Sequence, residues 1–303
     1  MDLLDRLRKD KAVNPWLEVA DKWLQMVEEN SIAFSDDSIV PSERLRVAAY
    51  EEKVSQMGKC GDFAIEKEIL PCPCIGSPEA EIWLMFKNPG CTCWDYYDFV
   101  SVQKGKDELL KDDSKSRRKA KFRKYDDEKD EEAALRTRQE LAIRQLKFDY
   151  SKSGFYVFND AFRTFEGRSM ACCGTYDWNE KMMFPAKGFL TSARNGQYME
   201  SWCASKVFEL DYHPYRSKRF DRDNASLIET PYWGDLVDYA FNHHKRMVFW
   251  GGWVLRKARE RVGESLYVKA VAERRILVMK SQRAMFSDET TYFPTTGFDI
   301  SEF

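Results

Sequence analysis

The chain has 303 residues, 43% of them hydrophobic, and a formal net charge of −2 at pH 7. This composition can fill a sizeable core, and the charge excludes an overall basic field, so any nucleic-acid binding must use a local patch. The first residues, MDLLDRLRKDK, lack the apolar core of a signal peptide, and no apolar run approaches the length of a membrane span. We therefore expect a globular, cytoplasmic protein.

Residues 1–58 have apolar side chains at spacings of three and four, such as Trp16, Val19, Trp23 and Met26. This periodicity predicts helices. We expect an N-terminal helical layer over residues 1–66 and an α/β domain over residues 67–303.

A proline-punctuated loop leads into the apolar run Ile82–Phe86, which stops at Lys87-Asn88-Pro89-Gly90. A run that is apolar at successive positions is typical of a strand covered on both faces. The simplest explanation of Asn-Pro-Gly is a tight turn.

Residues 103–148 form a charged insertion that contains the basic cluster KSRRKAKFRK and the acidic stretch DDEKDEE. Its last part has a helical pattern through Leu135, Ala142 and Leu146. The insertion is either a solvated helical arm or a basic segment that contacts phosphates.

Three more strands are predicted at 205–211, 246–250 and 274–279. The strand at 246–250 is followed by Gly251-Gly252 and then by a helix at 253–263. Gly263 ends this helix as a C-cap. Alternating strands and helices predict a three-layer α/β/α sandwich around a mostly parallel sheet of four strands. The loops at the carboxyl ends of such strands gather at one edge and form the site.

The order of these motifs resembles the uracil-DNA glycosylase superfamily, over roughly residues 68–290. FKNPG looks like the first motif of its thymine and mismatch-specific branch. MVFWGGWVLRKA resembles the strand, Trp-Gly turn and helix that precede the last motif of the superfamily, and ILVMKSQRAMFS occupies the place of its last loop. IGSPEAEIWLMFKNPG and HPYRS resemble uncharacterised bacterial relatives still more closely. Departures are Lys280, where a His is common, and a middle motif with acidic residues where uracil enzymes place an Asn.

The resemblance implies a DNA glycosylase in which Asn88 handles the hydrolytic water. Breaking an N-glycosidic bond develops positive charge on the sugar, so a water must be held beside the ring by polar groups. The Asn88 amide can orient that water, and the adjacent proline and glycine allow close approach of a nucleotide. Asp95 is the alternative carboxylate for this role.

A base taken out of the stack is held by aromatic faces and by hydrogen bonds to its edge. We expect Tyr96, Tyr97 and Phe99 to offer such faces, although aromatic residues at this spacing also form cores. Glu209 and Asp211 favour a base with an exocyclic amine, such as a modified cytosine, because a carboxylate accepts a hydrogen bond from the amine.

Each residue of the middle motif has a second explanation. The alternative for Glu209 and Asp211 is an ion pair with Arg216, Lys218 or Arg219. His213 is a further candidate for base binding, or it packs in the loop.

Several donors are suited to the phosphates that flank an extruded nucleotide. They are Ser217, which closes HPYRS, and the side chains of the last loop: Lys280, Ser281, Arg283 and Ser287.

We expect no cofactor and no metal. The eight cysteines in a chain without an export signal favour reduced thiols. Cys72-x-Cys74 and Cys91-x-Cys93 do not have the C-x2-C spacing that zinc ligands more often show, but a four-thiolate site remains the alternative.

The sequence thus predicts a monofunctional DNA glycosylase, monomeric, with DNA as its partner. A preference for modified cytosine would suit bacterial defence against phages. A non-catalytic nucleic-acid or nucleotide-binding module on the same fold and an interaction protein with a charged arm are the alternatives.

Overall fold

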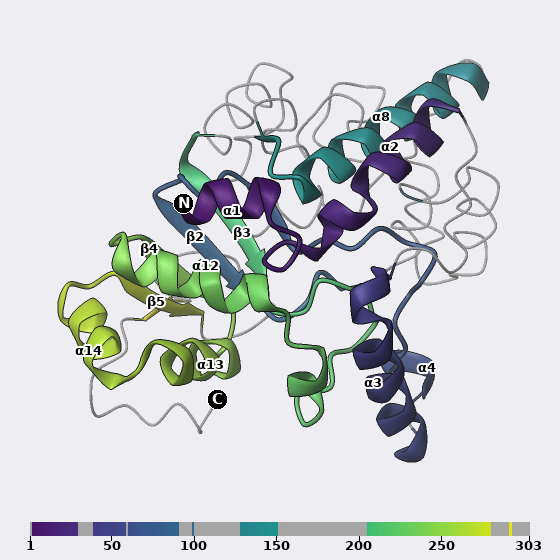
Figure 1. Cartoon of the computed structure of the whole chain (residues 1–303). Helices are drawn as coiled ribbons and strands as arrows, with labels where there is room; N and C mark the ends of the chain where they lie inside the picture. Colours follow the sequence, from purple (N-terminus) through teal and green to yellow (C-terminus); the bar gives the residue numbers. More distant parts are fainter. Residues whose placement is uncertain are drawn as a thin grey trace, which may run out of the picture.

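The protein is a mixed α/β protein, as a computed structural model of the whole chain shows (Figure 1). The residues that the structure describes are 2–29, 39–58, 60–90, 99, 128–150, 205–279 and 291–292.

A mostly parallel sheet lies at the centre of this part of the chain, in the strand order β1-β3-β2-β4-β5-β6. Strands β3, β2, β4 and β5 are parallel to their neighbours, while β1 and β6 pair antiparallel at the two edges. The bounds are β1 (Cys74–Gly76), β2 (Ile82–Phe86), β3 (Val207–Asp211), β4 (Arg246–Phe249), β5 (Ile276–Met279) and β6 (Thr291–Tyr292).

The four parallel strands begin and end within two residues of the predicted ranges. The expected number of four strands is wrong, because β1 and β6 also belong to the sheet. These edge strands have three and two residues, too few to show an alternating pattern.

Strand β2 is one of the two central strands, and its side chains are buried on both faces of the sheet. Trp83 and Met85 point to one face, Leu84 and Phe86 to the other, and all four are buried. Its unbroken apolar run is therefore explained by cover on both faces.

The N-terminal segment is helical, as predicted. It contains α1 (Leu3–Lys9), α2 (Ala20–Glu28), α3 (Arg44–Gln56) and the short α4 (Cys60–Phe63), with 3₁₀ turns at Pro15–Glu18 and Pro41–Glu43.

Helix α2 packs along α8 (Glu128–Leu146), which the pattern at the end of the insertion predicted (Figure 1). Asn14, which follows α1, is fully buried, and its side-chain nitrogen donates to the carbonyls of Leu7 in α1 at 2.7 Å and of Leu146 at the end of α8 at 2.8 Å. The buried side chains Trp16 and Trp23 belong to the same hydrophobic cluster as the sheet. Helices α1 and α2 therefore share one core with the strands, whereas the buried residues of α3 belong to a second hydrophobic cluster.

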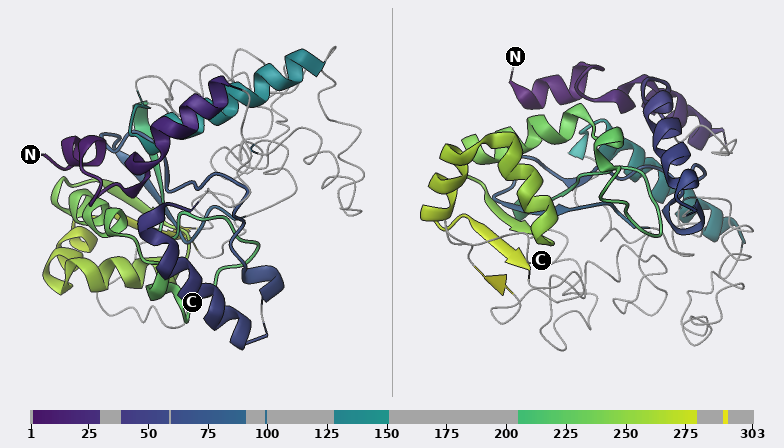
Figure 2. Two further views of the ribbon diagram at one scale, coloured as in Figure 1. Left: turned by 45° about the vertical axis from the view of Figure 1, so that its right-hand side comes forward. Right: turned by 90° about the horizontal axis from the view of Figure 1, so that it is seen from below.

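Helix α12 (Pro231–Asn242) lies against one face of the sheet, where the ring of Trp233 meets that of Tyr212 at 4.7 Å (Figure 2). Two further helices, α13 (Gly252–Val262) and α14 (Glu264–Ala272), lead from β4 to β5. Gly263 ends α13 with a φ of 80°, as the sequence predicted.

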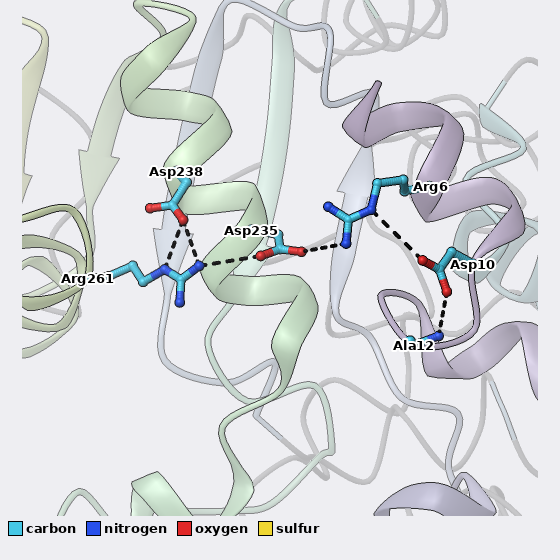
Figure 3. Close-up of polar contacts among 6 residues, drawn as sticks. All are labelled: Arg6, Asp10, Ala12, Asp235, Asp238 and Arg261. Carbon is cyan, nitrogen blue, oxygen red and sulfur yellow. Dashed lines mark hydrogen bonds and ion pairs between the residues drawn. The ribbon is translucent and has the colours of Figure 1, made fainter. Parts of the chain in front are cut away.

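A chain of charges on the surface connects α1, α12 and α13 (Figure 3). Arg261 contacts Asp238 at 2.7 Å and Asp235 at 3.4 Å, and Asp235 also lies 3.7 Å from Arg6. Each exposed pair contributes little by itself, but the shared carboxylate of Asp235 links three helices.

Among the described helices, none combines the length and the apolar character that crossing a membrane requires.

Candidate active site

The strand order makes the carboxyl ends of β2 and β4 the candidate edge for a ligand. The chain passes from β2 to β3 on one side and from β4 to β5 on the other, so the order reverses between β2 and β4. In open α/β sheets, ligands bind at the carboxyl ends of the strands at such a point. The residues there are Lys87-Asn88-Pro89-Gly90 after β2 and Trp250-Gly251-Gly252 after β4.

The backbone of this edge is held by pairing that continues past the strands. The Trp250 N–H donates to the Met85 carbonyl at 2.9 Å, and the His213 N–H donates to the Lys87 carbonyl at 2.8 Å. Gly251 has a φ of 110°, which a residue with a Cβ rarely adopts, and α13 begins at the next residue. The glycine therefore allows the chain to turn directly from β4 into a helix.

The side chains of Asn88 and Ser217, two of the predicted site residues, are in contact at this edge. The Asn88 side-chain nitrogen lies 3.3 Å from both the carbonyl oxygen and the hydroxyl oxygen of Ser217. Ser217 in turn donates its hydroxyl proton to the Arg219 carbonyl at 2.9 Å. A carbonyl only accepts, so the amide nitrogen of Asn88 must face Ser217 and its oxygen points elsewhere.

Glu209 and Asp211 lie on the same face of β3, two residues apart, and are 4% and 5% exposed. Glu209 is the middle residue of β3, and Asp211 is its last residue. Burial, together with the negative charge of Glu209, raises the pKa of Asp211 well above its usual range, although Arg216 opposes the shift. One Asp211 carboxyl oxygen has no hydrogen-bond partner within the described ranges. Asp211 therefore keeps its proton to a higher pH than an exposed aspartate does.

The predicted ion-pair partner Arg219 contacts a different carboxylate, that of Asp62, at 3.2 Å. Arg216 is buried, and its guanidinium lies 5.2 Å from the centre of the Phe99 ring. Phe99 is itself 1% exposed, so one face of its ring is covered by Arg216.

His213 is fully buried among the rings of Tyr50, Tyr215 and Phe220, at centroid distances of 6.1, 5.6 and 6.1 Å. Burial lowers the pKa of His213 to about 3. Its imidazole is therefore neutral at pH 7, which supports the packing role over proton transfer.

Several predicted site residues lie outside the described part of the chain. They are Asp95, Tyr96, Tyr97, Lys280, Ser281, Arg283 and Ser287.

Lys87 is a residue of this edge that the sequence reasoning missed. The pKa of Lys87 is lowered to about 8, mainly by burial and to a smaller extent by the charge of Arg222. The signal in the sequence was its place directly before Asn88 at a strand exit.

Two of the four cysteines of the alternative metal site lie in the described ranges. Cys72 and Cys74 are both buried, and burial is the largest cause that raises the pKa of the Cys74 thiol. Within the described ranges, no group of three or more His, Cys, Asp or Glu side chains is placed to hold a metal ion. Cys91 and Cys93 lie outside these ranges.

Comparison of the chain with protein-family models, with curated proteins and with solved structures gives no match.

Proposed function

We propose that this protein is a monofunctional DNA glycosylase that hydrolyses the N-glycosidic bond of a flipped-out damaged or modified base. The observation that carries the proposal is the fixed orientation of the Asn88 amide at the reversal point of the sheet. Because the amide nitrogen is held by Ser217, the amide oxygen is the end left to accept a hydrogen bond from a water. A water fixed in this way can attack the sugar carbon as positive charge develops on the sugar.

The same proposal includes the three-layer α/β/α arrangement of the superfamily that the motifs resemble. The parallel strands β3, β2, β4 and β5 and the helix α12 on one face support it. DNA is the proposed partner, and the proposed setting is defence against phages whose cytosines are modified.

Replacement of Asn88 by Ala is expected to lower the rate of base release by about a hundredfold or more, because the water loses its acceptor. The measurement is the formation of alkali-labile abasic sites in oligonucleotides that carry a panel of bases. Ser217→Ala should lower the rate less, since it loosens the amide without removing it. Asn242→Ala, an exposed asparagine at the end of α12, is the control.

Two outcomes would count against this assignment. Undiminished base release by Asn88→Ala would transfer the water-holding role to Asp95. DNA binding by the wild type without any abasic product would favour the binding module instead.

The base is expected to carry an exocyclic amine, and the preference for such a base should increase with pH. An ionised Asp211 accepts from the amine of a cytosine derivative, whereas a protonated Asp211 offers one donor and one acceptor and also fits uracil. The measurement is the rate of release of uracil, of cytosine and of cytosines modified at carbon five, at saturating DNA. The preference is the ratio of the release rate of a cytosine base to that of uracil. Asp211→Asn and Glu209→Asn should shift this ratio toward uracil. Efficient uracil release by the wild type, with the same ratio in both variants, would remove the carboxylates from base selection.

A further inference from the structure

The second hydrophobic cluster lies beside the turn that carries Ser217. Helix α3 packs against the 3₁₀ turn Ala225–Ile228 (Figure 1). The buried members of this cluster come from α3, from residues close to it in the chain and from both sides of Ser217: Ile39, Val47, Tyr50, Val54, Ile65, Tyr215 and Ile228. The chain before and after Ser217 is therefore packed against the N-terminal part of the protein.

The backbone of residues 214–219 is also hydrogen-bonded to residues 62–72. Three backbone hydrogen bonds of 2.8 Å join the two segments, which run in opposite directions. The donors and acceptors are the Cys72 N–H and the Pro214 carbonyl, the Glu66 N–H and the Arg216 carbonyl, and the Arg219 N–H and the Asp62 carbonyl. Ser217 thus lies between two fixed points of its own backbone.

A buried polar contact also fixes the side chain of Tyr215. Its hydroxyl donates to the carboxylate of Glu43, and both residues are at most 2% exposed. Arg46 in α3 donates to the other oxygen of this carboxylate at 2.8 Å and to the Glu229 carbonyl at 2.6 Å. The carboxylate of Glu229 accepts from the Tyr212 hydroxyl at 2.7 Å. Arg46 therefore connects the contacts of both tyrosines.

The Tyr215 contact is directional, whereas apolar packing is not. A hydrogen bond to a carboxylate restricts both the distance and the direction of its donor. Burying a carboxylate costs free energy, and an apolar side chain of similar volume often gives a fold of equal stability. A carboxylate at the place of Glu43 is therefore better explained by orientation than by stability.

We propose that Tyr215 and Glu43 position the Asn88 amide, and that helix α3 thereby takes part in the candidate site. The carboxylate fixes the Tyr215 ring, and the turn fixed in this way places Ser217, whose oxygens lie 3.3 Å from the amide nitrogen. Arg46 acts in the same way, since it holds the carboxylate. The role of the amide in holding water rests on the proposed function, whereas its orientation does not.

The first test observes the amide directly and needs no substrate. In protein with isotope-labelled asparagine, the side-chain NMR signals of Asn88 are identified by their loss in Asn88→Ala. Tyr215→Phe, which removes only the hydroxyl, should shift these signals and speed their exchange with solvent. The control Tyr267→Phe, at a buried tyrosine of α14, should leave them unchanged. Unmoved Asn88 signals in folded Tyr215→Phe would overturn the proposal.

Arg46→Gln keeps this test valid if Tyr215→Phe does not fold. The Arg46 side chain is 38% exposed, so its replacement leaves a smaller defect in the core. The same Asn88 signals should shift in this variant. Wild-type signals would contradict the proposal here too.

The second test asks whether Tyr215 acts through Asn88, and it uses the rate of base release at saturating DNA. Tyr215→Phe is expected to slow release by roughly ten- to a hundredfold, because a small misplacement of a group at the reacting atoms is costly. The same substitution made in Asn88→Ala should have no further effect, since the amide is absent. An equal reduction in both backgrounds, which a loss of folded protein would also cause, would overturn the proposal.

The two tests separate this proposal from the proposed function. The Asn88 signals require no base release, so a wild type that gives no abasic product would contradict the proposed function alone.

Discussion

At the scale of the residue, His213 places a titratable ring where its charged form is strongly disfavoured. The ring is surrounded by aromatic side chains and neither ring nitrogen has a hydrogen-bond partner within the described ranges. The folded pKa, about 3, is well below the ordinary value of 6.5. The unfolded chain therefore binds a proton that the folded chain does not bind, and folding becomes less favourable as pH falls from about 6.5 toward 3.

We expect His213 to cost the wild type about 1.4 kcal/mol of unfolding free energy for each pH unit below about 6.5. The variant His213→Phe removes the titration, so its stability should fall less over the same window. Urea denaturation of both proteins between about pH 4 and pH 7 measures the difference. Parallel curves would show that the imidazole gains a proton without unfolding the protein.

At the scale of the element, the turn between β4 and α13 depends on one glycine. Gly251 has φ 110° and ψ 146°, a region that only glycine occupies readily. The turn starts α13 directly at the strand end, where Trp253 packs against Tyr212 at 5.0 Å. The position of the helix start thus follows from the freedom of a residue without a side chain.

Gly251→Ala is expected to lower the unfolding free energy by roughly 1 to 3 kcal/mol, because the methyl group forces this backbone into strain. The control is Gly61→Ala in α4, where an added Cβ meets nothing within 4 Å and no positive φ is required. That variant should remain within about 0.5 kcal/mol of the wild type. If Gly251→Ala lost no more unfolding free energy than Gly61→Ala, the loop would have relaxed around the new methyl group.

The four parallel strands were predictable because each has a local pattern, whereas the short edge strands β1 and β6 have none, and the site was predictable only in part. The apolar run Ile82–Phe86 and the glycines after 246–249 are visible in a few consecutive residues. The contact between Asn88 and Ser217 joins residues 129 positions apart, and no local pattern specifies it. The lowered pKa of Lys87 also depends on the fold, because burial is its larger cause and the charge of Arg222 contributes.

At the scale of the whole molecule, the first helices of the chain complete a core that is built from later segments. Asn14 donates to Leu7 and to Leu146, so it connects α1 to the end of α8. The buried rings of Trp16 and Tyr232 meet edge to face at 5.0 Å. Helices α1 and α2 therefore share one hydrophobic core with α8 and α12.

The central place of β2 has a consequence for how the protein is made. Its first residue, Ile82, pairs with Val207 and Arg246, so its partners follow 125 residues later (207 − 82) and 164 residues later (246 − 82). At a synthesis rate of about 5 to 20 residues per second, the first partner leaves the ribosome roughly 6 to 25 s after the strand itself. During that interval the apolar residues 83–86 have no neighbouring strand of this sheet, and they are a natural binding site for chaperones. Expression of the intact protein should therefore depend on chaperone supply more than on the stability of the finished fold.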